Sequence, residues 1–547
     1  MRGSRVRPTL VAALVVCSPS LVRGGQDDTQ TLGRIRNEVE QAEGAGEADR
    51  LRAVYADDVL LVTPDFPPVV GADAVAEFMR FLFERYQVET HYTHDTTAWA
   101  GDSVIERGVV RQVWTPRSGE EETTDVRPYR WVYHRDAKGS WKQSEIVWGE
   151  PGPVRSMVPR LLAPTGPYAV GLRHLYFVDP KRLESFTPDP DDHREVAVQV
   201  WYPAVRPRDR QPAKYQSLET TRAAAAFLGW PMWSNSYHSL VETNAFEDAA
   251  FADRGASFPV LLYNHGYSGF TTVHTALLED LASHGYIVAS VGHAYESALF
   301  IRPNGDVTRF TPDNAEYQAR VDEATGEIQE AFKDSILLAR DLRSREHWYR
   351  ELLRTSPKHQ ESAWIWTADI GFVIDRLQAM NQREGEFAEV MDLERIGVLG
   401  HSLGGAAAGQ ITLTDPRVQA GINIDGFQFG DMIDRPLTKP FMFMGARRPW
   451  AGDSTIANDV FFRKAERSAY VVLIAGFTHG TFTDLPLFED AWGDAGSIID
   501  GERALAIQRA YVRAFFDKHL RGRSTSLLDG PSSAFPEVHL RARTENH

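Results

Sequence analysis

The sequence predicts two folded parts in tandem: an α+β cone near the amino terminus, followed by an α/β fold with a mainly parallel sheet. Three observations support this. The chain has 547 residues, which is too long for one ordinary hydrophobic core. Helical periodicity over residues 29–86 gives way to alternating strand patterns that run to residue 148. Beyond residue 168, short apolar strands alternate with helical segments, as in parallel sheets.

The composition is that of a soluble globular protein, with 43% hydrophobic and 24% charged residues. The formal net charge of -16 argues against a nucleic-acid or anionic-membrane partner, because binding phosphates needs a basic face. Cys17 is the only cysteine, which excludes an intrachain disulfide and a cysteine-type zinc site.

Residues 1–24 are typical of a secretory signal peptide. Three arginines precede a largely apolar stretch from Pro8 to Val22, which is too short to span a bilayer comfortably. We therefore expect a secreted or periplasmic protein. Val16 is a poor residue immediately before Cys17, so we do not expect lipoprotein anchoring at this cysteine.

Residues 28–150 are predicted to form the cone, with helices first and a curved antiparallel sheet afterwards. Residues 51–58 (LRAVYADD), 130–134 (RWVYH) and 139–142 (GSWK) resemble the nuclear-transport-factor-2-like or SnoaL-like family. The resemblance implies that the cone holds a pocket. Because no unambiguous acid–base pair stands out, we expect a packing, dimerisation or substrate-capturing module.

Residues 151–168 are predicted to be an interdomain linker, since five prolines interrupt any periodicity. The α/β part then covers residues 169–547. Between residues 203 and 257 lies an aromatic-rich insertion, which either lines an acyl pocket or adds to the core.

The α/β part alternates strands and helices in the order that a parallel sheet requires. Strands are predicted at residues 171–178, 196–202, 259–263, 286–291, 396–399, 420–424, 440–444 and 469–474. Helices are predicted at residues 275–284 and 364–380, with polar helical pieces over 314–354 and a last helix at 504–520 that closes the chain. Ligand chemistry in such sheets lies beyond the carboxyl ends of the strands, which selects the candidate residues.

Residues 400–404 (G-H-S-L-G) lie between an apolar strand and an Ala-rich segment of good helix propensity. Strand, sharp turn and helix in this order predict a nucleophile elbow that presents Ser402. The alternative is an ordinary Gly-rich turn in a nucleotide-binding sheet. A serine hydroxyl needs an adjacent histidine to take its proton and a carboxylate to orient that histidine.

His479 is the predicted general base, because it alone among the histidines after Ser402 lies in a Gly-flanked loop just beyond a strand. Two aspartates are candidates for the acid. Asp425 ends the first strand after the elbow helix, and Asp453 lies in the loop after the next strand. By position alone the two are close.

An oxyanion hole requires two backbone N–H groups aimed at the developing negative charge. We expect one from Leu403, immediately after the nucleophile, and the other from Tyr267, in the loop after the strand at 259–263. His265, in the same loop, is a weaker catalytic candidate, because it precedes the serine and is better suited to supporting the loop.

Five segments together resemble the plasma-type platelet-activating-factor acetylhydrolase family: residues 259–267, 280–289, 396–406, 421–425 and 476–479. The resemblance covers roughly residues 171–521 and implies an α/β-hydrolase fold. In that family the acid follows the first strand after the elbow, which favours Asp425 over Asp453. The plasma enzymes carry no amino-terminal cone, so this chain departs from the family there.

We therefore expect a serine esterase that cleaves small-molecule or lipid esters of short or modified acyl groups through an acyl-enzyme, with no cofactor. The alternatives are a lipase or cutinase-like polyester hydrolase, a non-catalytic ligand-binding protein on a hydrolase scaffold, and a cone isomerase with an accessory hydrolase. Peripheral lipid contact and a homodimer through the amino-terminal cone are left open.

Overall fold

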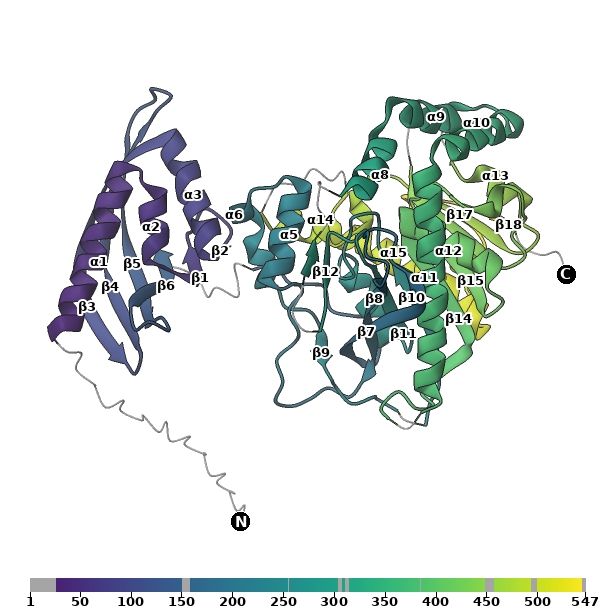
Figure 1. The fold of residues 1–547 in the computed structure, drawn as a ribbon, viewed down its shortest axis with the longest axis horizontal. Coiled ribbons are helices and arrows are strands. Elements are labelled where there is room, and N and C mark those ends of the chain that lie inside the picture. Colours follow the sequence, from purple (N-terminus) through teal and green to yellow (C-terminus); the bar gives the residue numbers. More distant parts are fainter. Residues whose placement is uncertain are drawn as a thin grey trace, which may run out of the picture. The chain divides into compact units, whose positions relative to one another are not determined.

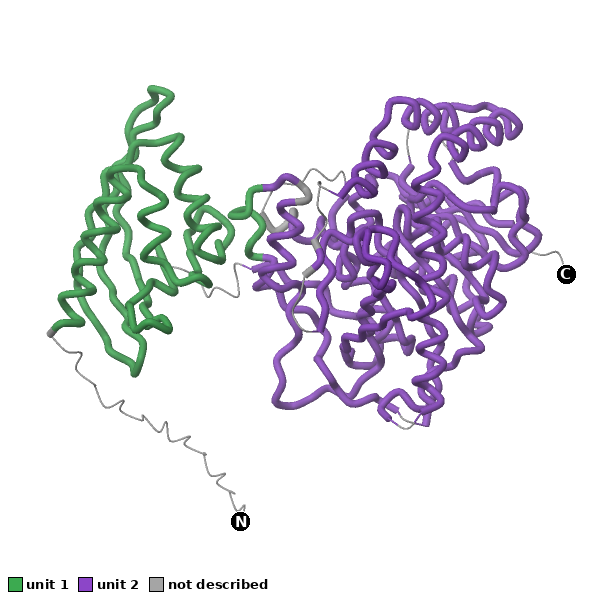
Figure 2. The backbone as a smooth tube through the Cα atoms, viewed as in Figure 1, with its two compact units in different colours: residues 1–157, 231–237 green, residues 158–230, 238–547 purple. Residues whose placement is uncertain are grey.

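The computed structural model describes residues 26–149, 158–253, 255–303, 307–309, 314–383, 385–447, 457–492 and 499–543. The predicted signal peptide, residues 151–157 of the predicted linker and Asp453 lie outside the described residues. The chain forms two compact units (Figure 2). Unit 1 comprises residues 1–157 and 231–237, and unit 2 comprises residues 158–230 and 238–547.

Unit 1 is a sheet covered by helices (Figure 1). Its helices are α1 (Gln26–Ala45), α2 (Ala48–Val54), α3 (Ala72–Arg85) and the short α6 (Met232–Asn235). Its strands are β1 (Tyr55–Val62), β2 (Val69–Val70), β3 (Tyr86–Ala100), β4 (Ser103–Pro116), β5 (Thr123–Arg135) and β6 (Trp141–Trp148), in the order β2-β1-β6-β5-β4-β3. Tyr129, Trp131 and Tyr133 alternate along β5 and are buried in the unit's hydrophobic core.

The prediction of a helical pattern throughout residues 29–86 is wrong at β1 and β2. Helix α2 ends at Val54, and β1 follows at once with Val59 and Leu61 buried. Strand β1 pairs in parallel with β6, which lies about 80 residues later in the chain. This partner lies too far along the sequence for local periodicity to reveal it.

A short segment of the aromatic-rich insertion belongs to unit 1. Trp233, in α6, lies 4.8 Å from Phe81, 5.4 Å from Phe78 and 6.0 Å from Phe66, measured between ring centroids. The Ser236 hydroxyl oxygen accepts a hydrogen bond from the N–H of Val70 at 2.8 Å. Residues 231–237 therefore complete the hydrophobic core of unit 1.

Unit 2 is built on a ten-stranded sheet in the order β18-β17-β16-β15-β14-β10-β11-β8-β7-β9. Six neighbouring strands are parallel: β10 (Phe258–Asn264), β11 (Ile287–His293), β14 (Met391–His401), β15 (Val418–Ile424), β16 (Phe441–Ala446) and β17 (Ala469–Ile474). The remaining strands lie toward the edges: β7 (Ala169–Leu183), β8 (His193–Ala204), β9 (Ala245–Glu247) and β18 (Val538–Arg543). A separate hairpin joins β12 (Leu299–Ile301) and β13 (Val307–Arg309).

Helices flank both faces of this sheet (Figure 1). The helices of unit 2 are α5 (Leu218–Leu228), α7 (Thr275–Ser283), α8 (Ala315–Thr325), α9 (Glu327–Leu338), α10 (Leu342–Thr355), α11 (Pro357–Asn381), α12 (Leu403–Thr414), α13 (Asp459–Lys464), α14 (Leu485–Trp492) and α15 (Gly501–Arg521). Helices α11 and α12 pack against each other on the face where Val260 and Leu262 are buried. Helices α7 and α15 pack together on the opposite face.

One expectation for unit 2 is wrong, and burial decides between the two alternatives for the aromatic-rich insertion. The predicted last helix does not close the chain, because β18 follows α15 and pairs antiparallel with β17 at the sheet edge. Its sequence, VHLRAR, alternates apolar and polar residues as a half-buried strand does, and the strand covers the edge of β17. In the aromatic-rich insertion, Tyr237 and Phe246 are buried, so this stretch contributes mainly core.

Among the described residues, no helix combines the length and the apolar character that crossing a membrane requires.

The packing of Trp233 in unit 1 can be tested by Trp233→Ala. Removing this aromatic side chain should cost about 3 kcal/mol of local stability, because it leaves a gap against three phenylalanine rings. Native-state hydrogen exchange of the whole chain should show faster exchange in α3. Trp364→Ala is the matched control, since Trp364 is 43% exposed on α11 and should leave exchange in α3 unchanged. Unchanged exchange in α3 with Trp233→Ala would contradict this packing.

Candidate active site

The turn from β14 into α12 places Ser402 at the carboxyl edge of the parallel sheet. Strand β14 ends at His401 and α12 begins at Leu403, so Ser402 forms the turn alone. Its backbone has φ 55° and ψ -122°, in a region that side-chain-bearing residues rarely adopt. The predicted strand, sharp turn and helix are therefore present.

Two glycines allow this turn to form. A Cβ on Gly400 would lie 2.2 Å from the carbonyl oxygen of Gly404, and one on Gly404 would lie 2.3 Å from the carbonyl oxygen of Asn264. Any side chain at either position would push the helix away from the strands. The backbone of Ser402 is also fixed, because its N–H donates to the carbonyl oxygen of Ile424 at 2.8 Å.

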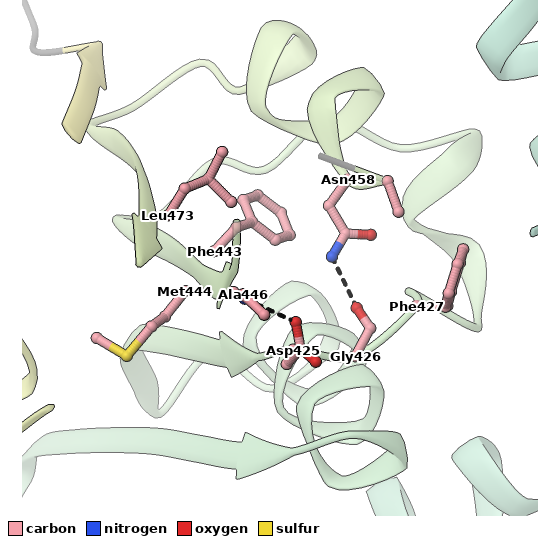
Figure 3. A pocket seen from close by; sticks show the side chains of 10 residues that line it. Asp425, Gly426, Phe427, Phe443, Met444, Ala446, Asn458 and Leu473 are labelled. Atoms are coloured by element: carbon pink, nitrogen blue, oxygen red, sulfur yellow. Dashed lines mark hydrogen bonds between the residues drawn. The ribbon is translucent and has the colours of Figure 1, made fainter. Parts of the chain in front are cut away.

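Asp425 follows β15, the strand next to β14, and has an equally unusual φ of 51°. Its N–H donates to the carbonyl oxygen of Met444 at 2.7 Å, and its Oδ1 accepts from the N–H of Ala446 at 3.0 Å (Figure 3). These bonds tie both the backbone and the carboxylate of Asp425 to β16. The side chain is only 2% exposed, so its charge depends on such partners.

The imidazole of His479 provides the second partner of this carboxylate. Nδ1 of His479 lies 2.8 Å from Oδ2 of Asp425. Because an ionised carboxylate only accepts, the proton of this bond is on Nδ1, and Nε2 is left as the basic nitrogen. The side chain of His479 is 50% exposed, so this nitrogen is accessible from solvent. This arrangement is the one that the aspartate–histidine part of a catalytic triad requires.

Ser402 is linked to this pair through its neighbours. A Cβ on Gly426, which follows Asp425, would lie 2.1 Å from the carbonyl oxygen of Ser402. The ring of His401 lies 4.4 Å from that of His479 between centroids. Among the described residues, no hydrogen bond joins the Ser402 hydroxyl to His479. Such catalytic contacts are often long until substrate binds.

A cavity of about 30 Å³ lies next to Asp425 and is lined in part by Phe443 and Asn458 (Figure 3). This volume accommodates a water molecule but no acyl group. Asn458 Nδ2 donates to the carbonyl oxygen of Gly426 at 2.7 Å, and Asn458 Oδ1 accepts from the Tyr349 hydroxyl at 2.7 Å. The cavity wall therefore supports the turn after Asp425.

The loop after β10 approaches the elbow closely. A Cβ on Gly266 would lie 3.2 Å from the Cβ of Ser402. The carbonyl oxygen of Gly266 accepts from the N–H of Gly269 at 2.8 Å and lies 2.6 Å from Nδ1 of His265. In a trans peptide the C=O of Gly266 and the N–H of Tyr267 point in opposite directions. Holding this carbonyl therefore also fixes the direction of the Tyr267 N–H.

His265, the weaker catalytic candidate, supports this loop. It is fully buried, and burial lowers its pKa to about 3, so it stays neutral. Its single proton must be on Nδ1, which faces the carbonyl oxygen of Gly266. Its Nε2 lies 2.9 Å from the hydroxyl oxygen of Ser297, which also lies 2.9 Å from the carbonyl oxygen of His293. Both ring nitrogens are thus used within the protein.

Aromatic side chains from the helices after β13 surround Tyr267. Its ring lies parallel to that of Tyr317 in α8, with centroids 6.1 Å apart, and 6.0 Å from the ring of His359 in α11. His359 stacks in turn on Phe429, in the loop after β15, at 5.4 Å. Sequence patterning did not identify these residues, because they come from separate elements that only the fold brings together.

The sequence-predicted residues lie as follows. Asp425 and His479 are in direct contact, while Ser402, Leu403 and Tyr267 lie at the adjoining turns. Asp453 lies outside the described residues. Among the described residues, no three histidine, cysteine, aspartate or glutamate side chains are grouped to hold a metal ion.

Two segments of the chain match known protein families. Residues 159–523 match the model of the family described as platelet-activating factor acetylhydrolase, isoform II, and residues 36–143 match a SnoaL-like domain. The platelet-activating factor acetylhydrolase of Cavia porcellus is 24% identical over 65% of this chain and 77% of its own length. That of Gallus gallus is 26% identical over 68% of this chain and 87% of its own length.

Among solved structures, a ferulic acid esterase from Streptomyces cinnamoneus is 29% identical, with a TM-score of 0.53, over 70% of this chain and 99% of that chain. The predicted fold class and both predicted family resemblances are confirmed. The family match alone covers more than half of the chain. The protein therefore belongs to the platelet-activating factor acetylhydrolase, isoform II, family and is a carboxylic ester hydrolase that carries a SnoaL-like domain.

Proposed function

We propose that Ser402, His479 and Asp425 form a catalytic triad that hydrolyses esters of short or modified acyl groups through an acyl-enzyme. The observation that carries this proposal is the 2.8 Å contact between His479 Nδ1 and Asp425 Oδ2 at the strand end next to the elbow. That contact sets the tautomer in which Nε2 can accept the serine proton.

In the acylation step, His479 Nε2 takes the proton of the Ser402 hydroxyl as Oγ attacks the ester carbonyl carbon. The carbonyl oxygen becomes an oxyanion, which accepts hydrogen bonds from the N–H groups of Leu403 and Tyr267. The leaving alcohol departs with the proton from His479, and the acyl group stays on Ser402. Asp425 remains ionised and stabilises the imidazolium that forms between these events.

Deacylation repeats the same steps with water. His479 takes a proton from a water molecule whose oxygen attacks the acyl-enzyme carbonyl, and then returns that proton to Ser402 Oγ. The acid leaves and the enzyme is restored. All the proton transfers use one histidine.

The proposed substrate is an ester with a small or planar acyl group. Three rings crowd one side of the loop after β10 that carries Tyr267, namely those of Tyr267, Tyr317 and His359. This crowding favours compact acyl groups. We call this loop the oxyanion loop. The relatives are named for hydrolysing platelet-activating factor and ferulic acid esters, and both names fit this class. A lipase or polyester hydrolase is the alternative, and it would need room for long chains.

We also propose that the protein is exported, on the basis of the signal-peptide pattern in residues 1–24. Peripheral contact with lipid and a homodimer through the SnoaL-like domain stay predictions. Fractionating the producing cells and measuring the mass of the purified protein in solution would test export and the dimer.

Ser402→Ala should abolish hydrolysis of p-nitrophenyl acetate, because no other nucleophile takes part in the acylation step. The urea unfolding midpoint should stay near that of the wild type, since alanine occupies the same turn with fewer atoms. A Ser402→Ala variant with appreciable turnover would refute the proposed nucleophile.

Asp425→Asn should lower kcat by roughly 10⁴-fold, because an amide cannot hold the reactive tautomer of His479. Asp453→Asn is the matched control, and it should change kcat by less than about twofold. Steady-state kinetics on p-nitrophenyl acetate compare the two variants directly. A larger loss in Asp453→Asn would move the role of the acid to that residue.

The acyl preference can be measured with p-nitrophenyl esters of two to sixteen carbons, together with a feruloyl ester. We expect kcat/KM to be highest for acetyl or feruloyl groups and to fall at least about tenfold by twelve carbons, because the aromatic rings leave little room. A maximum at long chains would instead favour the lipase alternative.

A further inference from the structure

His401, the residue between Gly400 and Ser402, lies next to the proposed nucleophile. It also contacts the loop of the proposed base and the loop of the proposed oxyanion donor. It ends β14 and is 6% exposed. Its ring contacts the rings of His274 and His479. The mechanism above assigns it no role.

The first contact of His401 is with the loop that carries the general base. Its Nε2 lies 3.1 Å from the carbonyl oxygen of His479, and the two rings are 4.4 Å apart between centroids. The second contact is with the oxyanion loop, because a Cβ on Gly266 would lie only 3.2 Å from His401 Nδ1. The ring therefore touches both loops from the base of the elbow.

The protonation state of His401 follows from these surroundings. Burial, together with the nearby rings of His479 and His274, lowers the pKa of His401 well below its usual value, so the ring is neutral. A neutral imidazole carries one proton. Because Nε2 faces a carbonyl oxygen, which can only accept, that proton is on Nε2 and is donated to His479.

A further histidine, His274, packs against the ring of His401. It lies 5.2 Å from the ring of His274 between centroids, and Nδ1 of His274 lies 2.5 Å from the hydroxyl of Tyr263. Tyr263 is fully buried in β10. The ring of His401, which donates to His479, is therefore supported through His274 by a residue of β10, a central strand of the sheet.

His479 consequently has two anchors. Asp425 fixes its imidazole through Nδ1, and His401 fixes its backbone through the carbonyl oxygen. With only the first anchor, the loop around residue 479 could shift while the Asp425 bond followed it. With both, the backbone and the ring are fixed together, and so is the position of Nε2 relative to Ser402.

We propose that His401 is a positioning residue for the general base: its Nε2–H holds the carbonyl oxygen of His479, so that the elbow which presents the nucleophile also sets the position of the base. This inference rests on the proposed triad. A displacement of about 1 Å in such a group can lower the rate by about a hundredfold, so the expected effect is on the chemical step.

The test compares His401→Leu with His401→Gln in the full chain. Leucine fills a similar space without a donor, whereas the glutamine amide presents an N–H at about the depth of the histidine Nε2. On p-nitrophenyl acetate, His401→Leu should lower kcat by about 10- to 100-fold with KM changed less than about twofold. His401→Gln should stay within about fivefold of the wild type. Ser402 labelling by a fluorophosphonate should slow in the same order.

His519→Leu is the matched control, because it makes the same change on α15, where the His519 ring packs on Phe515. It should leave kcat within about twofold of the wild type. Urea midpoints of both His401 variants should match each other. Wild-type kcat in His401→Leu would overturn the proposal, and so would equal losses in His401→Leu and His401→Gln, which would indicate packing alone. Turnover by Ser402→Ala would instead refute the triad itself.

Discussion

The proposed catalytic site depends on the hydrogen bond between His479 Nδ1 and Asp425 Oδ2, because this bond leaves Nε2 of His479 as the basic nitrogen. Asp425 departs from extended geometry directly after β15, with φ 51°, and Ser402 does the same directly after β14, with φ 55°. Two adjacent parallel strands thus each end in a strained residue. Backbone strain of this kind persists only where the surroundings over-determine it.

At the proposed site, hydrogen bonds and close packing hold these two strained residues in place. The N–H of Ser402 is held by Ile424, the last residue of β15, and the N–H of Asp425 is held by Met444, in β16. The glycines of the elbow leave no room for a side chain. The free energy that the core of unit 2 supplies through packing offsets the cost of these strained turns, and that is how a protein without a disulfide can keep them rigid.

Two buried histidines hold backbone carbonyl oxygens in the loops of the proposed site. His265 holds the carbonyl of Gly266, next to the proposed oxyanion donor Tyr267, and His401 reaches the carbonyl of the proposed base His479. Burial lowers the pKa of both well below the usual value, so each remains a neutral, directional donor. An imidazole suits this use because it combines a hydrogen-bond donor with a flat, packable ring.

The sequence by itself determined what is local: the elbow at Ser402 follows from glycine spacing between a strand and a helix, and the loop of His479 follows from its own glycines. The choice of Asp425 over Asp453 came from family resemblance, because spacing left them close. Only the tertiary structure decided the rest. Strand β18 depends on an edge supplied by β17, and the contact of His401 with His479 spans 78 residues. The sequence of β18 alternates as a strand does, but its partner strand cannot be read from it, since pairing and hydrogen bonding over such distances depend on the completed sheet rather than on neighbouring residues.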